Sequence, residues 1–388
     1  MKERRQPRSV RSAAVAAALV AASALAVMLA AGSLSPPPAR AAVAKGIIDN
    51  RLEAEPADSA ARAGIIREID RRLGAKWVRV VVYWSALEPS RGEYSATELA
   101  RLDALVGDLR AARVKVILTT SSMPAWATDS YWWTHPPAGH AQGPQGFYPI
   151  RSDRLRDYGD LAEFLARRYK AKVQALENWN EPNLWPYLYP QRTVDDPYFA
   201  ARVYLRMQKA FHAGVKRART SVRVVAGATA PVGLNDRYRT SPQRFARFLK
   251  RAGAGRYFDV YSHHPYTPGG SVYPAPGRPP NDPSTAVTLF NLRTLLRLFP
   301  KKPFYLTEYG YSTKPSAALG GFSVSGRAQA RYLREAYRLA TSYRQVKLLV
   351  WFLLRDQAPM SGPGTGVYSG LRRTNGERKP AWYAFRRL

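Results

Sequence analysis

Two glutamates are the residues in this chain whose types and positions best suit catalysis. Glu181 lies in the motif Asn180-Glu181-Pro182, inside the stretch Leu176 to Asn183. Glu308 ends the apolar run Pro303 to Glu308, which reads as a buried strand that finishes in an acid. Cleavage of a glycosidic bond needs two such carboxyl groups, because one protonates the leaving oxygen and the other attacks or supports the sugar carbon. The pair therefore predicts an enzyme.

The two glutamates are 127 residues apart, so a repeating set of elements must bring them together. After residue 41 the chain alternates short β-branched runs with amphipathic helical stretches. We expect strands over Gly46 to Asp49, Trp77 to Tyr83, Val114 to Thr119, Val173 to Asn178, Val222 to Ala226, Phe258 to Ser262, Pro303 to Glu308 and Lys347 to Phe352. We expect helices over Ser59 to Leu73, Ala96 to Ala112, Leu155 to Tyr169, Tyr198 to Arg219, Pro242 to Ala252, Thr285 to Leu298, Ala328 to Tyr343 and Pro380 to Leu388.

Eight strands that alternate with eight helices predict an α/β fold, a parallel (β/α)8 TIM barrel. In such a barrel the carboxyl ends of all strands share one rim, so Glu181 after the fourth strand and Glu308 at the end of the seventh would face each other. The loops after the strands are long and aromatic, as in Ala125 to Ser152, whereas those before the strands are short. This asymmetry is typical of a barrel whose working face is that rim.

The first 41 residues differ in composition from the rest. Five basic residues between Lys2 and Arg11 precede the charge-free, alanine-rich run Ser12 to Gly32, and Ala39-Arg40-Ala41 supplies a small-x-small cleavage site. These features predict a signal peptide cleaved after Ala41, but the apolar run is also long enough to be an uncleaved membrane anchor. We therefore expect residues 1–41 to be a signal or anchor segment and residues 42–388 to be one catalytic domain. The protein would be secreted or anchored to the outer face of the cytoplasmic membrane.

The chain is strongly basic, with a formal net charge of +32. Removing residues 1–41, which carry six basic and one acidic side chain, leaves +27. The arginines are scattered over helix-like stretches and not gathered in one arm or recognition helix, so nucleic-acid binding is not expected. An anionic cell envelope is a plausible partner for such a surface. We expect a monomer that acts on a carbohydrate.

Other chemistries lack their residues. The sequence has no cysteine, which excludes disulfides, a thiolate nucleophile and cysteine-bound zinc. It has no Gly-x-Ser-x-Gly elbow and no His-Glu-x-x-His motif, and no phosphate-binding glycine loop follows a strand. His263 and His264 are adjacent on a strand and would face opposite sides, which does not suit a shared metal. We expect neither a cofactor nor a metal.

Several further motifs accompany the two glutamates. They are Val78-Arg79-Val80 with Trp84 and Glu88-Pro89, Pro124-Ala125-Trp126-Ala127, Trp179-Asn180-Glu181-Pro182-Asn183, His264-Pro265-Tyr266, Thr307-Glu308-Tyr309-Gly310 and Trp351-Phe352. With them the sequence resembles the clan A retaining glycoside hydrolases, which are TIM barrels, over nearly all of residues 42–388. Within that clan it is most similar to family 39 and family 5-like bacterial members.

The resemblance implies roles for the central residues. Glu181 would be the acid/base, Glu308 would be the nucleophile, and Asn180 would bind the sugar 2-hydroxyl. Arg79 and Tyr266 would keep Glu308 ionised, and His264 would support the same network. Trp351 would form a floor under the sugar ring.

The residues leave some interpretations open. Glu177 lies within the fourth strand and is better explained as the partner of an internal arginine than as a catalytic group. The leading hypothesis is a retaining glycoside hydrolase that cleaves a β-linked polysaccharide or oligosaccharide by double displacement, through a covalent glycosyl-enzyme. A transglycosylase acting on envelope glycan would use the same residues. A catalytically silent carbohydrate-binding barrel would keep the aromatic side chains and lose one acid.

Overall fold

The computed structural model describes residues 1, 42–53, 59–268, 275–316, 323–359 and 366–388. Residues 43–388 form one compact unit. The predicted leader, residues 2–41, lies outside the described residues. In the described part of the chain, no helix combines the length and the apolar character needed to cross a membrane.

Within these residues, eight parallel strands pair in chain order, and the last pairs with the first to close a barrel. This confirms the predicted (β/α)8 fold. The strands are β1 (Ala44–Ile48), β2 (Trp77–Tyr83), β3 (Lys115–Ser121), β4 (Ala175–Glu177), β5 (Arg223–Thr229), β6 (Val260–His263), β7 (Phe304–Tyr309) and β8 (Val346–Phe352).

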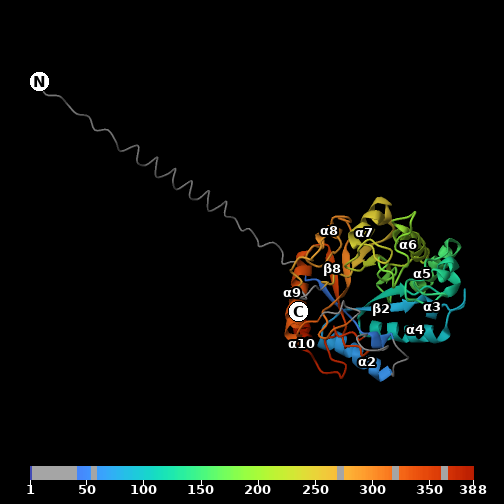
Figure 1. The fold of residues 1–388 in the computed structure, drawn as a ribbon. Coiled ribbons are helices and arrows are strands. Elements are labelled where there is room, and N and C mark those ends of the chain that lie inside the picture. The colour runs from blue at the N-terminus through green and yellow to red at the C-terminus, as the bar shows by residue number, and fades with distance from the viewer. Residues whose placement is uncertain (2–41, 54–58, 269–274, 317–322, 360–365) are drawn as a thin grey trace. The chain divides into compact units, whose positions relative to one another are not determined.

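The helices form a ring around the strands, as Figure 1 shows. They are α2 (Ser59–Arg67), α3 (Trp84–Leu87), α4 (Ala96–Ala111), α5 (Leu155–Arg168), α6 (Phe199–Arg217), α7 (Pro242–Arg251), α8 (Arg293–Leu296), α9 (Gly326–Ser342) and α10 (Pro380–Arg386). Serine side chains start two of them, because Ser95 accepts a hydrogen bond from the Glu98 backbone NH and Ser325 accepts one from that of Ala328.

Two predicted helices differ from the structure. The first changes to a π-helical turn at Glu68–Arg72 after Ser59–Arg67. The helix predicted over Thr285 to Leu298 is wrong for most of its length, because helical structure covers Arg293–Leu296 alone. Asn291 explains the difference: its side chain accepts from the Thr288 backbone NH and donates to the carbonyl of Ala286. Such local bonds give the backbone an alternative to helical pairing.

The apolar core has two layers, which follow from the alternation of side chains along each strand. The inner cluster takes residues from every strand and therefore fills the barrel; it includes Trp77, Ile117, Ala175, Val225, Val260, Tyr305 and Leu348. The outer cluster, larger, lies between the strands and the helices, and it contains Val78, Val80, Leu176, Leu306 and Leu349. A barrel packed in this way holds the ends of its strands rigidly.

Candidate active site

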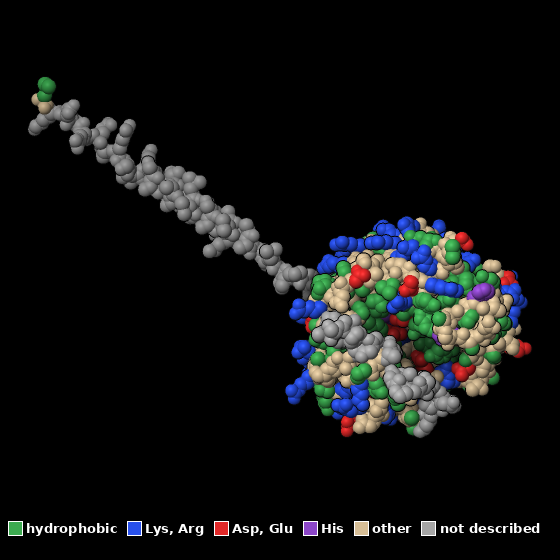
Figure 2. All heavy atoms as spheres, in the orientation of Figure 1, with side chains coloured by type: hydrophobic (Ala, Val, Ile, Leu, Met, Phe, Trp, Pro, Cys, Tyr) green, Lys and Arg blue, Asp and Glu red, His purple; other side chains and the backbone are tan. Residues whose placement is uncertain are grey.

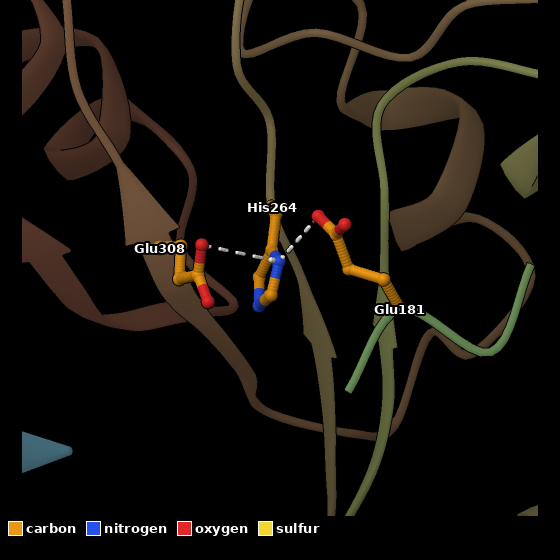
Figure 3. A group of neighbouring side chains, drawn as sticks. All are labelled: Glu181, His264 and Glu308. Carbon is orange, nitrogen blue, oxygen red and sulfur yellow. Dashed lines mark hydrogen bonds and ion pairs between the residues drawn. The ribbon is translucent and has the colours of Figure 1, made fainter. Parts of the chain in front are cut away.

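Glu308 and Glu181 lie at the same rim of the barrel and point toward one another, with His264 between them (Figure 3). His264 Nδ1 is 2.9 Å from Glu181 Oε1 and 3.8 Å from Glu308 Oε2. One ligand atom from each of the three residues lies within 4.8 Å of the other two. Figure 2 shows acidic side chains in a central hollow bordered by apolar ones. The structure thus brings together carboxyl groups that the sequence separates.

A local irregularity in β7 aims Glu308 at the barrel mouth. Strict alternation would turn Glu308 outward with Leu306, because Thr307 faces the interior. Leu306 pairs with Leu349 and Tyr309 pairs with Trp351, so three steps along β7 match two along β8. An extra residue of this kind turns the side chains that follow it.

The backbone after β4 is strained where it carries Glu181. Glu181 has φ 38° and Trp179 has φ 68°, a left-handed conformation that non-glycine residues seldom adopt. The Glu181 NH donates to the carbonyl of Ala228, at 3.0 Å, and the Trp179 indole donates to the carbonyl of Tyr187, at 2.8 Å. These bonds hold the turn, and strain maintained in this way is common at functional sites.

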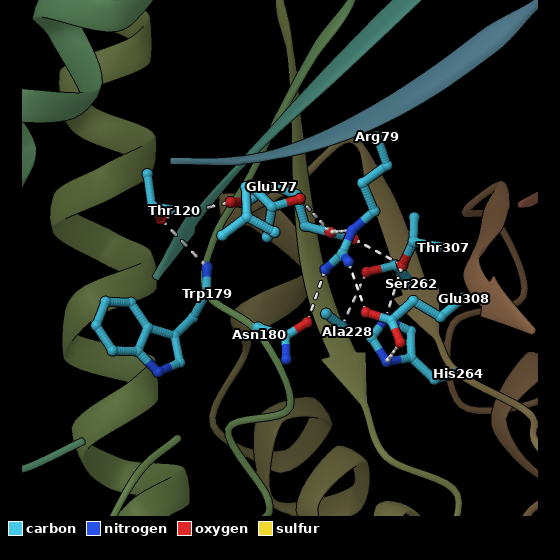
Figure 4. Close-up of polar contacts among 12 residues, drawn as sticks. Arg79, Thr120, Glu177, Trp179, Asn180, Ala228, Ser262, His264, Thr307 and Glu308 are labelled. Carbon is cyan, nitrogen blue, oxygen red and sulfur yellow. Dashed lines mark hydrogen bonds and ion pairs between the residues drawn. The ribbon is translucent and has the colours of Figure 1, made fainter. Parts of the chain in front are cut away.

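Arg79 is the hub of the site, as Figure 4 shows. Its side chain points into the barrel from β2 and is 1% exposed. It donates to Glu177 Oε2 at 2.7 Å, to Glu308 Oε1 at 2.7 Å and to Asn180 Oδ1 at 2.8 Å. The interpretation of Glu177 as the partner of an internal arginine is confirmed. Because Arg79 donates to the amide oxygen of Asn180, the amide NH2 group is the part of this side chain that can serve as a donor at the rim.

A chain of hydrogen bonds determines where the protons lie. The Thr307 hydroxyl donates its one proton to Glu177 Oε1, at 2.9 Å, so it must accept from His264 Nε2, which is 3.1 Å away. A neutral His264 with its proton on Nε2 has a lone pair on Nδ1. That lone pair can accept a proton only from Glu181, at 2.9 Å. With a neutral His264, the 2.9 Å contact therefore needs a protonated Glu181 carboxyl, whereas a His264 cation would donate to an ionised Glu181.

Electrostatics agrees with this arrangement. Burial raises the pKa of Glu181, and the charge of Glu308 adds to the rise, while the His264 contact opposes it. Burial alone would also raise the pKa of Glu177, but Arg79, His264 and hydroxyl donors outweigh it and keep that pKa below its ordinary value. The two glutamates on β4 and its turn thus favour opposite protonation states.

Three predicted residues remain: Tyr266 makes the expected contact, and His264 and Trp351 differ from the expectation. Tyr266 donates to Glu308 Oε2 at 3.0 Å, as the resemblance implies. His264 lies closer to Glu181, at 2.9 Å, than to Glu308, at 3.8 Å, whereas the resemblance implies that it supports the network around Glu308. The expectation for Trp351 is wrong: it is fully buried in the outer core, and its indole donates to the Ser369 carbonyl. Adjacent residues face opposite sides of a strand, so Phe352, partly exposed beside the inner cluster, faces the barrel instead.

Sequence reasoning missed Thr307 and Glu53. Thr307 precedes Glu308 by one residue, and period-two alternation on β7 was the signal that would have placed it inside the barrel. Glu53 accepts from the Val81 backbone NH at 2.8 Å, and burial raises its pKa to about 7. No motif marks Glu53, because its position depends on how β1 and β2 meet.

Glu181, His264 and Glu308 also form the one cluster of possible metal ligands found among the described residues. The donor set fits a cation poorly. Arg79 and Tyr266 already donate to the two oxygens of Glu308, and the Arg79 guanidinium is 2.7 Å from one of them. A metal ion would have to displace these bonds and lie beside a buried positive charge.

Comparison with known proteins relates part of the sequence, and the fold, to glycoside hydrolases. Residues 60–183 match the model of glycoside hydrolase family 42, described as beta-galactosidase. The match includes Asn180 and Glu181 and ends before Glu308. None of the curated proteins matches the chain.

Solved structures share the fold at low identity. A family 39 glycoside hydrolase from Bacteroides cellulosilyticus WH2 is 20% identical with a TM-score of 0.62, over 88% of this chain and 62% of its own. A GH5_18 protein from Streptomyces cattleya, solved with GlcNAc, is 17% identical with a TM-score of 0.61, over 89% and 79%. A beta-galactosidase from Marinomonas ef1 is 16% identical with a TM-score of 0.60, over 89% and 58%. The chain thus spans about three fifths of the first and third of these.

The structural likenesses show the barrel fold. Together with the family match they confirm the predicted resemblance to glycoside hydrolase barrels, and they support the prediction of an enzyme of that class.

Proposed function

We propose that this protein is a retaining glycoside hydrolase that cleaves β-linked sugars by double displacement. The observation that carries the proposal is the pair Glu181 and Glu308, whose carboxyl oxygens approach within 4.8 Å at one rim. Retaining enzymes hold their two carboxyl groups about 5 to 5.5 Å apart, whereas inverting enzymes need about 6.5 to 9.5 Å to admit a water molecule. The short separation favours direct attack by one carboxylate.

The contacts assign the two roles. Glu308 receives hydrogen bonds from Arg79 and Tyr266, which favour a carboxylate able to attack the anomeric carbon. Glu181, buried and facing the Nδ1 lone pair of His264, holds the proton that the leaving oxygen needs. As the glycosidic C–O bond breaks, Glu308 forms an ester to the sugar and the Glu181 proton passes to the leaving group. Glu181, now ionised, then takes a proton from water, whose oxygen displaces Glu308.

For the substrate, we infer the broad class of β-linked sugars. The matched family model and one structural neighbour are both described as beta-galactosidase, which supports a β-linked substrate for this chain. The partly exposed Phe352 at the barrel mouth, and not the buried Trp351, offers an apolar face to a sugar ring.

A transglycosylase that passes the glycosyl group from Glu308 to a second sugar would use the same two steps with a different acceptor. A catalytically silent binding barrel is disfavoured, because both acids are present with their supporting contacts.

Proton NMR of the first-formed sugar tests the proposal. Wild-type protein acting on an aryl β-glycoside should release the β-anomer before mutarotation. Glu308→Ala should lose turnover, and added azide should restore it on an activated aryl glycoside and yield the α-glycosyl azide. A first-formed α-anomer would show that Glu308 is not the nucleophile.

A further inference from the structure

A second hollow lies at the opposite end of the barrel from the two glutamates. It is open to solvent, has a volume of about 720 Å³, and is lined at the amino ends of the strands by Ala44 of β1, Trp77 of β2 and Tyr305 of β7, among others. The seven-residue β2 spans about 20 Å at the usual rise per residue, so the hollow is far from the catalytic rim. It is therefore separate from the site described above.

The charged residues that line this hollow are all basic. They are Lys115, Arg223, Lys301, Lys302, Arg344 and Lys347. Among the described residues, none of the six forms an ion pair with a carboxylate, although 21 pairs of a lysine or arginine with a carboxylate occur elsewhere on the barrel, such as Arg51 with Asp49. Asp259 lies at the start of β6 on the same face, but it pairs with Lys216 at 3.8 Å and does not line the hollow.

The basic side chains are placed by the fold. Arg223 donates to the Tyr305 hydroxyl at 3.1 Å, and Lys302 donates to the Phe258 carbonyl at 2.6 Å. The Lys115 ammonium lies 5.3 Å from the centre of the Trp77 ring. These neighbours are neutral, so they orient the cations without cancelling their charge. The hollow combines an aromatic floor with a ring of uncompensated positive charge.

We propose that this hollow binds a segment of an anionic polysaccharide through its carboxylate or phosphate groups. A polysaccharide strand is narrow enough to enter the hollow and bring several anions against the six cations. A bilayer or a nucleic-acid duplex presents a broad surface, which would contact the edge of this hollow without entering it. Because the hollow is at the other end of the strands, a bound polymer would leave the catalytic mouth open.

Binding of polygalacturonate to the barrel, residues 42–388, tests this assignment. That unit contains all eight strands and closes on itself, so it does not need the leader to complete its core. Calorimetry or affinity electrophoresis should show binding that weakens with salt. The same polymer with its carboxyl groups methyl-esterified should bind much more weakly, because it keeps the backbone and loses the charge.

A matched pair of variants locates the binding. Lys115→Gln, Lys301→Gln and Lys347→Gln together should weaken binding by roughly tenfold or more, because the three exposed cations lose their charge in the hollow. Arg327→Gln, Arg334→Gln and Arg338→Gln remove the same charge from exposed positions on α9 and should change binding little. Turnover of a small neutral glycoside should be unchanged in both, which separates this test from that of the active site.

Equal loss of polygalacturonate binding in the two triple variants would overturn the proposal, since it would indicate net charge and not the hollow. Binding of the esterified polymer with equal affinity would do the same. If anionic vesicles or duplex DNA bound through the hollow while polygalacturonate did not, the assigned class of ligand would be wrong.

Discussion

At the scale of single residues, the two carboxyl groups of the site have different neighbours. Glu308 receives hydrogen bonds from Arg79 and Tyr266, and Glu181 Oε1 lies 2.9 Å from His264 Nδ1. Burial raises the pKa of Glu181 because an ionised carboxyl loses its hydration there, which fits the acid role that we propose for it. In the mechanism that we propose, the surroundings of two identical side chains therefore decide which is the acid and which is the nucleophile.

Glu181→Gln should abolish the alkaline limb of the pH profile. The wild-type reaction needs protonated Glu181, so kcat/KM should fall as pH rises through the pKa of this residue, and a raised pKa extends activity to higher pH. The glutamine cannot give up a proton. Loss on natural substrates should be about 10²- to 10⁴-fold, and much smaller on aryl glycosides whose leaving groups need no proton. Equal losses on both substrates would contradict the acid role.

Thr307→Val should move the alkaline limb to lower pH. Without the hydroxyl that accepts from Nε2, His264 can place its proton on Nδ1 and donate to Glu181, which favours the ionised acid. Activity near neutral pH should fall roughly tenfold, the cost of a lost buried hydrogen bond. Thr307→Ser retains the hydroxyl and should restore the wild-type profile. A valine variant with reduced activity and an unmoved limb would indicate a packing role alone.

At the scale of elements, close approach of backbones sets how the helices around β4 pack. A Cβ on Gly214 of α6 would lie 1.8 Å from the carbonyl oxygen of Gly159 on α5. Gly107 of α4 has no atom within 4 Å of such a Cβ. Both glycines lie within helices, but only Gly214 lies where the backbone of a neighbouring helix approaches closely.

Alanine substitution should therefore act in opposite directions at these two positions. Gly214→Ala should lower the free energy of unfolding by about 1–3 kcal/mol or more, because α5 and α6 must move apart. Gly107→Ala should raise it by about 0.5–1 kcal/mol, the difference in helix propensity. Urea unfolding of both variants measures the effect. Similar stability in the two variants would mean that the α5–α6 contact is looser than the structure indicates.

At the scale of the whole molecule, the barrel separates two kinds of surface. Acidic side chains lie in the catalytic hollow at the carboxyl ends of the strands, and six cations line the hollow at the amino ends. The basic residues, which give the chain a net charge of +32, are therefore not distributed evenly over the barrel. We propose that the protein works outside the cytoplasm, where its basic surface would meet anionic envelope material.

Export should remove the leader after Ala41. The basic residues from Lys2 to Arg11 and the apolar run Ser12 to Gly32 have the composition of a signal peptide. Amino-terminal sequencing of protein from the culture fluid should begin at Ala42. Protein that begins at Met1 and remains with the membrane fraction would favour the anchor, and cytoplasmic protein that begins at Met1 would contradict export.

Much of the architecture was determined by the sequence alone. The alternation of β-branched runs with amphipathic stretches predicted the barrel, because periods of two and 3.6 residues select strand and helix locally. The positions of Glu181 and Glu308 at strand ends then predicted a shared rim. The helix over Thr285 to Leu298 was mispredicted, because a single side chain, Asn291, satisfies the backbone differently.

The tertiary structure decided which side chains face the chemistry. The extra residue in β7 aims Glu308, and the left-handed turn after β4 aims Glu181. Phe352, and not the expected Trp351, faces the barrel interior, because closure of the barrel defines which face of β8 is inside. The path from Arg79 through Glu177 to His264 joins β2, β4, β6 and β7. No local pattern encodes such contacts, because each depends on registers set when distant strands pair.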